Sequence, residues 1–112
     1  MRFIAATLAC AVWVSAGVPG AVAAGGAPKP ATHTIAIDGT RYEPATMTIN
    51  RGDTVVWVNK DPFPHTVTSK EGKFDSSTLM PDKTWKLKPT KTGAFSYVCL
   101  LHPTMKATLR VE

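Results

Sequence analysis

Hydrophobic and polar residues alternate in short runs along most of the chain from about residue 33 onward. Alternation of this kind is typical of β-strands that bury one face. Turn-forming residues, mainly Gly, Pro, Asn and Asp, separate the runs. The pattern predicts about seven strands, over residues 33–37, 45–49, 54–59, 65–69, 84–88, 94–99 and 107–112.

No segment of useful length repeats its hydrophobic residues with helical periodicity, so crossover helices between the strands are not expected. Strands that follow one another without such helices favour antiparallel pairing. We therefore predict an all-β fold, an antiparallel sandwich or barrel. In the run 94–99 the alternation places Phe95, Tyr97 and Cys99 on one face, with Cys99 at the end of its strand.

The start of the chain has a different character. Arg2 precedes an almost unbroken apolar run over residues 3–16, and small residues follow at Ala21 and Ala23. This arrangement is typical of a secretory signal cleaved after residue 24, and the run is short for a membrane anchor, which is the alternative. We expect a signal peptide over 1–24, a flexible leader over 25–31, a domain over 32–112, and a periplasmic location.

The formal net charge of +5 is mild, and the lysines fall in turns or alternate with other residues. No array of basic and aromatic residues suggests nucleic-acid binding. A solvated basic face is favoured, and steering of an acidic partner is the alternative. No stable membrane insertion is expected after cleavage, and we expect a monomer.

Of the two cysteines, Cys10 would leave with the signal, so Cys99 would be a lone thiol in an oxidising compartment. His102 and Met105 follow Cys99, each after two intervening residues. A thiolate, an imidazole and a thioether form a soft ligand set that suits copper, whereas zinc gains little from the thioether. The natural fourth ligand is His65, and we interpret His33 as a surface histidine without partners.

Each residue also has an ordinary explanation. Cys99 could be an inert buried thiol, Met105 a core side chain and His102 an exposed loop residue. Their combination with His65 favours metal binding over three coincidences. Two histidines, a cysteine and a weak axial methionine are the ligands of blue-copper electron-transfer centres.

The segments "GDTVVWVNKD", "PHTV" and "YVCLLHPTMKATLRVE" resemble the small blue copper proteins, or cupredoxins, and among them the amicyanin-like members. The short spacing of Cys99, His102 and Met105 carries this resemblance. It implies an eight-stranded Greek-key sandwich, with His65, Cys99 and His102 as equatorial copper ligands and Met105 as the axial one. Thr66 stands where the amicyanin-like members often have asparagine, and its hydroxyl could still bond to the neighbouring loop.

These features predict a periplasmic one-electron carrier that cycles one copper ion between Cu(I) and Cu(II). Its partners would be redox proteins, such as a cytochrome c or a dehydrogenase. They would dock transiently on apolar residues around His102, which are Pro62, Phe63, Pro64, Leu100, Leu101 and Pro103. A copper shuttle or store with the same ligands is the main alternative, and a metal-free binding module is a weaker one. An enzyme is not expected, because all four coordination positions are filled by side chains.

Overall fold

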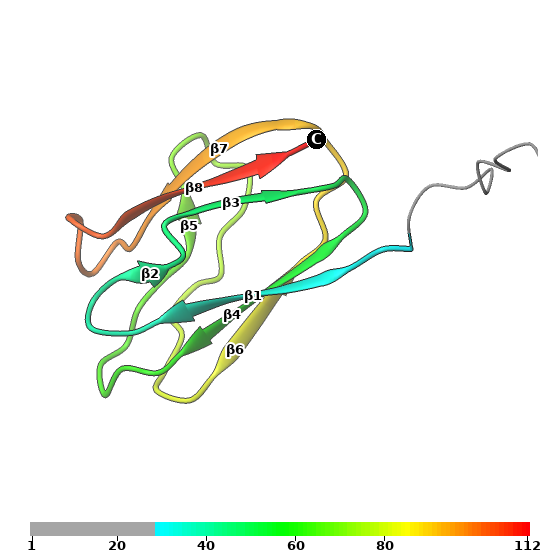
Figure 1. Cartoon of the computed structure of the whole chain (residues 1–112). Coiled ribbons are helices and arrows are strands. Elements are labelled where there is room, and N and C mark those ends of the chain that lie inside the picture. The colour runs from blue at the N-terminus through cyan, green and yellow to red at the C-terminus, as the bar shows by residue number, and fades with distance from the viewer. Residues whose placement is uncertain (1–28) are drawn as a thin grey trace, which may run out of the picture.

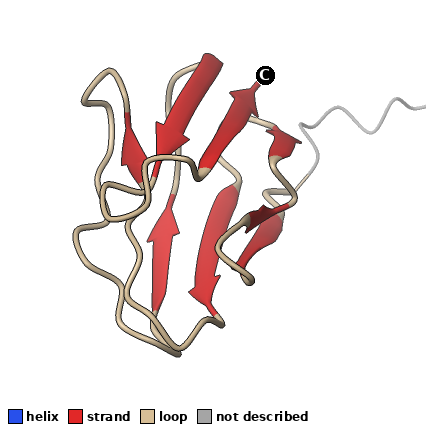
Figure 2. Ribbon diagram, turned by 90° about the vertical axis from the view of Figure 1, so that its left-hand side faces the viewer, coloured by secondary structure: helices blue, strands red, loops and turns tan. Residues whose placement is uncertain are grey.

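The computed structural model describes residues 29–112, and the predicted signal peptide and most of the predicted leader lie outside them. Eight strands form two four-stranded sheets, and no helix occurs among these residues. Figure 1 shows how the strands are arranged, and Figure 2 shows the same fold from the side. Nothing in this part of the chain could therefore cross a membrane as a helix. The strands are β1 Thr32–Ile37, β2 Tyr42–Glu43, β3 Thr46–Ile49, β4 Thr54–Asn59, β5 Thr68–Ser69, β6 Thr84–Leu87, β7 Gly93–Val98 and β8 Lys106–Val111.

The predicted all-β sandwich is confirmed, but the pairing is mixed. The first sheet has the order β2-β1-β4-β6 and the second the order β3-β8-β7-β5. β1 pairs with β4 in parallel, and β3 pairs with β8 in parallel. The predicted antiparallel pairing does not hold for these two pairs, because the chain passes through the opposite sheet between the paired strands and needs no crossover helix.

Two other strand predictions need correction. The sequence analysis missed β2, whose two residues are too short for an alternation signal and are followed at once by Pro44. The predicted strand 65–69 is reduced to β5, with an isolated bridge between His65 and Leu79. Residues 65–67 are all buried, and the amide groups of Thr66 and Val67 bond to side chains instead of a neighbouring strand.

The core lies between the sheets and centres on aromatic side chains. Trp57 and Tyr97 are fully buried on facing sheets, and the indole N–H of Trp57 donates to the Tyr97 hydroxyl at 3.3 Å. Their rings meet edge to face, a favourable arrangement for two aromatic side chains. Cys99 continues the buried face of β7 and is itself fully buried, as its strand alternation predicted.

Several loops gather at the end of the sandwich where β4 and β7 finish. Figure 1 shows the β7–β8 loop, the β1–β2 loop and the loop after β4 at this end, and the C-terminus at the other. The first of these loops carries residues 99–105 and the last carries residues 60–67. Histidine and cysteine side chains that lie far apart in sequence are therefore brought to one end of the molecule.

The opposite end is held by a polar contact that sequence reasoning missed. The prediction that His33 lacks partners was wrong, because its Nε2 lies 2.9 Å from Oδ2 of Asp53. The same carboxylate accepts hydrogen bonds from the amides of Ala31 and Asn50. The amide of Ala31, the ring of His33 and the amide of Asn50 hold the pKa of Asp53 below its usual value. Asp53 thus joins the start of β1 to the turn before β4.

Replacing Asp53 with Asn should lower the melting temperature at neutral pH, because an amide cannot accept all of these bonds. The pKa of Asp53 is lower in the folded protein than its ordinary value of 3.8, so folding favours the ionised carboxylate. Its contribution to stability is therefore complete above that value and is lost as the pH falls through the lower folded pKa. Thermal unfolding of the variant at a series of pH values should show a deficit that shrinks in acid.

Asp38→Asn is the matched control, because Asp38 is exposed and no hydrogen bond involves its side chain among the described residues. An equal effect of the two substitutions at neutral pH would contradict this role for Asp53.

Candidate metal centre

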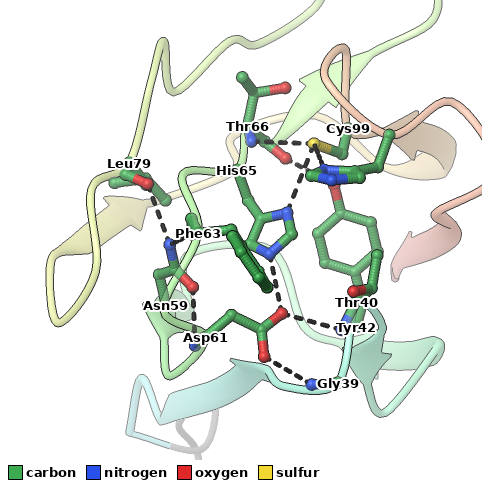
Figure 3. Close-up of polar contacts among 11 residues, drawn as sticks. Gly39, Thr40, Tyr42, Asn59, Asp61, Phe63, His65, Thr66, Leu79 and Cys99 are labelled. Carbon is green, nitrogen blue, oxygen red and sulfur yellow. Dashed lines mark hydrogen bonds and ion pairs between the residues drawn. The ribbon is translucent and has the colours of Figure 1, made fainter.

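His65 is a fully buried histidine whose ring is fixed by a carboxylate. Its Nε2 lies 2.8 Å from Oδ2 of Asp61, which is 6% exposed (Figure 3). An ionised carboxylate can only accept, so Nε2 carries the ring hydrogen. The other ring nitrogen, Nδ1, then keeps its lone pair and lies 3.7 Å from Sγ of Cys99. Asp61 therefore sets both the orientation and the tautomer of His65.

Asp61 is itself held by backbone groups of the β1–β2 loop. The amides of Gly39 and Thr40 donate to its two oxygens at 2.7 and 2.8 Å. Burial opposes ionisation of this side chain, but the bonds from Thr40, Gly39 and His65 outweigh it and keep its pKa below the usual value. The carboxylate is thus charged at neutral pH.

The loop between β4 and His65 is ordered by a buried amide. Nδ2 of Asn59, at the end of β4, donates to the carbonyls of Phe63 and Leu79, and Oδ1 accepts the amide of Asp61. Leu79 in turn exchanges two backbone hydrogen bonds with His65. The Asn59 side chain uses three of its bonding positions to fix the loop, so Asp61 and His65 have little freedom.

Cys99 follows the last residue of β7 and points inward beside His65 (Figure 3). The amide of Thr66 donates to its Sγ at 3.3 Å. The hydroxyl of Thr66 accepts the amide of Leu100 at 2.9 Å and lies 2.9 Å from that of Thr68. Thr66 therefore joins the segment that carries His65 to the loop that follows Cys99, as its sequence position suggested.

The short loop after Cys99 is closed by its own backbone. The amide of His102 donates to the carbonyl of Cys99, and the amide of Met105 donates to that of His102. The amide of Cys99 donates back to the carbonyl of Met105 at 3.2 Å. The spacing of two intervening residues is therefore the spacing of two successive tight turns, which bring Met105 back beside Cys99 and bury it.

Three side chains converge at this end of the sandwich. Nδ1 of His102 lies 3.8 Å from Sγ of Cys99, and the ligand atoms of His65, Cys99 and His102 all lie within 4.8 Å of one another. Two atoms bound to one metal ion at about 2.0–2.3 Å, with angles near 120°, lie about 3.5–3.8 Å apart. The separations from the sulfur fit a shared metal ion.

The structure brings three of the predicted copper ligands together and places His33 elsewhere. His65, Cys99 and His102 come together, Met105 is joined to Cys99 through the backbone, and His33 lies with Asp53 instead. Sequence reasoning missed Asp61 and Asn59, which hold the first histidine. The four-residue separation of Asp61 and His65 is a recognisable signal only on a helix, and here both lie in a loop.

The family of cupredoxin-like domains matches residues 3–111 of the chain. The chain belongs to the cupredoxin family. Amicyanin from Paracoccus versutus is 31% identical to this cupredoxin over 96 residues, which cover 81% of this chain and 72% of amicyanin. Plastocyanin from Scenedesmus fuscus is 30% identical over 84 residues, covering 63% of this chain and 86% of plastocyanin.

Solved structures agree with this assignment. The oxidised state of an amicyanin mutant has 27% identity and a TM-score of 0.68, over 72% of this cupredoxin and 82% of the amicyanin chain. A copper-containing nitrite reductase from Thermus scotoductus has the same identity and TM-score, but the match covers only 23% of that enzyme. The family and the soft ligand set together identify copper as the cofactor.

Replacing Thr66 with Val should destabilise the protein by about 1 kcal/mol, because the amide of Leu100 loses its acceptor. Thr68→Val is the control, since it removes a hydroxyl that contacts Thr66 but leaves the acceptor for Leu100 in place. Urea unfolding of the two variants measures the difference. Equal destabilisation would mean that the link to Leu100 has no special role.

Proposed function

We propose that this cupredoxin is a one-electron carrier, in which His65, Cys99 and His102 bind one copper ion and Met105 is a weak fourth ligand. The main support is the convergence of three ligand atoms, which are Nδ1 of His65, Sγ of Cys99 and Nδ1 of His102. Bound copper would supply a one-electron couple between Cu(I) and Cu(II). A relative is known in two oxidation states, since amicyanin variants have been solved as Cu(I) and in an oxidised state.

The residues around the ligands suit such a carrier because they resist rearrangement. His65 is held by Asp61, and Cys99 accepts the amide hydrogen of Thr66. A hydrogen bond to the sulfur stabilises the negative charge of the thiolate, and such bonds tune the reduction potential of copper sites. A ligand set that cannot relax between oxidation states lowers the structural change that accompanies electron transfer.

His102 differs from the other ligands in its exposure. His65 and Cys99 are fully buried, whereas His102 is half-buried and lies in the outer loop. Electron exchange with another protein requires a short path from the site to the surface. We assign that path to the ring of His102.

The surface around His102 supports this assignment. Among the described residues, four large hydrophobic side chains are at least half exposed, and all belong to segments of the site. These are Phe63, Met80, Leu100 and Leu101, which we call the apolar patch. Phe63 precedes His65 by two residues, Met80 follows the residue that pairs with His65, and the two leucines separate Cys99 from His102. Exposed apolar groups gathered in this way mark sites of protein association, and transient redox contacts need only small areas.

A carrier in the periplasm is the proposal that fits the apolar N-terminal run of residues 3–16. An enzyme would need a coordination position open to substrate, and the four side chains assigned here leave none. A copper shuttle or store would need ligands that a recipient can reach, whereas His65 and Cys99 are fully buried. The physiological partner of the proposed carrier would be a periplasmic redox protein, such as a cytochrome c or a dehydrogenase.

The copper site is tested by adding Cu(II) to the protein lacking residues 1–24. One equivalent should produce an intense blue band from charge transfer between the Cys99 thiolate and copper. Cys99→Ser should abolish the band, because a serine oxygen cannot provide this transition. His33→Ala should leave it unchanged, since His33 lies with Asp53.

Absence of the blue band in the unmodified protein would refute the carrier proposal. A blue band that a weak chelator removes within seconds would instead favour the shuttle or store.

The apolar patch is tested by electron self-exchange, in which two copies of the protein dock. Each copy of the Leu101→Glu variant carries the new carboxylate, so two like charges meet when the copies dock. Exchange should therefore slow by about tenfold, which corresponds to about 1.4 kcal/mol. The copper spectrum should not change, because Leu101 is half exposed and contributes no ligand. NMR line broadening in mixtures of oxidised and reduced protein measures the rate.

Thr92→Glu is the matched control, because it adds the same charge at an exposed position just before β7, at the opposite end of the strand from Cys99. Equal slowing by the two substitutions would show that net charge, and not the apolar patch, governs docking.

A further inference from the structure

A hollow of about 250 Å³ lies at the edge of the sandwich away from the copper ligands, and it is open to solvent on one side. Its floor is apolar and comes from both sheets: Leu87 on β6, Phe95 on β7 and Leu109 on β8. Phe74, in the connection between β5 and β6, completes it. Leu109 is fully buried, so it lies beneath the partly buried side chains of Leu87, Phe74 and Phe95, which form the accessible floor.

The rim of the hollow is basic. Lys73, Lys88 and Lys91 line it, and its lining contains no aspartate or glutamate. The ion pairs among residues 29–112 involve only His33, Arg41 and His65 on the basic side, so these three lysines have no carboxylate partner there. Three unpaired ammonium groups beside an apolar floor attract a molecule that carries both a negative charge and an apolar body.

The walls of the hollow are firm. Phe74 packs against Trp85, Phe95 and Tyr97 with ring centroids 6.0–6.3 Å apart. The carbonyl of Pro89, which also lines the hollow, accepts the amide of Gly52 at 3.2 Å and joins the β6–β7 loop to the turn before β4. A hollow with fixed walls loses little conformational entropy when a ligand enters.

We propose that this hollow binds a small amphipathic carboxylate, with its ring or short alkyl chain between the two sheets and its carboxylate among the three lysines. The size limits the ligand: an apolar cavity of about 150 Å³ already accepts benzene, so 250 Å³ has room for one ring and a short chain. The apolar floor disfavours a bare inorganic anion, and the concave shape, with side chains from both sheets, favours an inserted group over a flat protein contact. This site is separate from the proposed copper ligands, none of which lines it.

The experiment uses the copper-loaded protein and three probes that share a phenylpropyl body: 3-phenylpropanoate, 3-phenylpropanol and 3-phenylpropylammonium. Amide shifts in ¹H–¹⁵N NMR spectra report binding. 3-Phenylpropanoate should give saturable shifts at Phe74, Leu87 and Phe95 with a dissociation constant in the millimolar range, about what a ligand of eleven non-hydrogen atoms reaches. The alcohol should bind about fivefold more weakly, and the ammonium probe more weakly still.

Lys88→Gln combined with Lys91→Gln should weaken 3-phenylpropanoate about fivefold and leave the alcohol unchanged. Lys86→Gln is the control, because Lys86 is exposed on β6, two residues before Lys88, and does not line the hollow. These lysines are exposed, so the variants should fold normally.

Three results would overturn the proposal. The first is no saturable shift at these residues with 3-phenylpropanoate. The second is equal binding of acid and alcohol, or equal weakening by Lys86→Gln. The third is a shift of the same amides with protein concentration alone, which would assign the hollow to a second copy of the chain.

Discussion

The contact between Asp61 and His65 is the constraint on which the site depends. A carboxylate at 2.8 Å from Nε2 leaves Nδ1 as the free nitrogen and directs it toward Cys99. The carboxylate can remain charged and buried because two backbone amides, those of Gly39 and Thr40, point at it. Burying a charge is costly unless such groups are supplied, so the β1–β2 loop belongs to the site although it provides no ligand.

Further hydrogen bonds hold the segments around this contact and the opposite end of the sandwich. Asn59 fixes the loop that carries Asp61 and His65, while Thr66 joins His65 to the loop after Cys99. Three loops from both sheets are thereby connected by hydrogen bonds around the ligands. The opposite end is held by Asp53, which connects the start of β1 to the turn before β4. A small domain without disulfides among its described residues can hold a metal site when both ends of its sheets are fixed in this way.

Much of this could be predicted from the sequence. Alternating runs indicated a sandwich, and the soft side chains at Cys99, His102 and Met105, with His65, indicated a copper site, because ligand chemistry is a property of residue type. The parallel pairs β1–β4 and β3–β8 could not be predicted, since local alternation of hydrophobic and polar residues does not record which strand lies beside another. β2 was too short to produce a pattern. Asp61 could not be recognised because its role follows from the meeting of two loops, which only the fold brings about.

We propose that the fold holds the copper ligands in one arrangement for both oxidation states. Crystal structures of the copper-loaded protein at neutral pH, one oxidised and one reduced, test it most directly. We expect copper bound by Nδ1 of His65, Sγ of Cys99 and Nδ1 of His102 in both, with Nε2 of His65 still bonded to Asp61. Copper held by other residues, or a His65 ring turned away from Asp61 in either state, would contradict this arrangement.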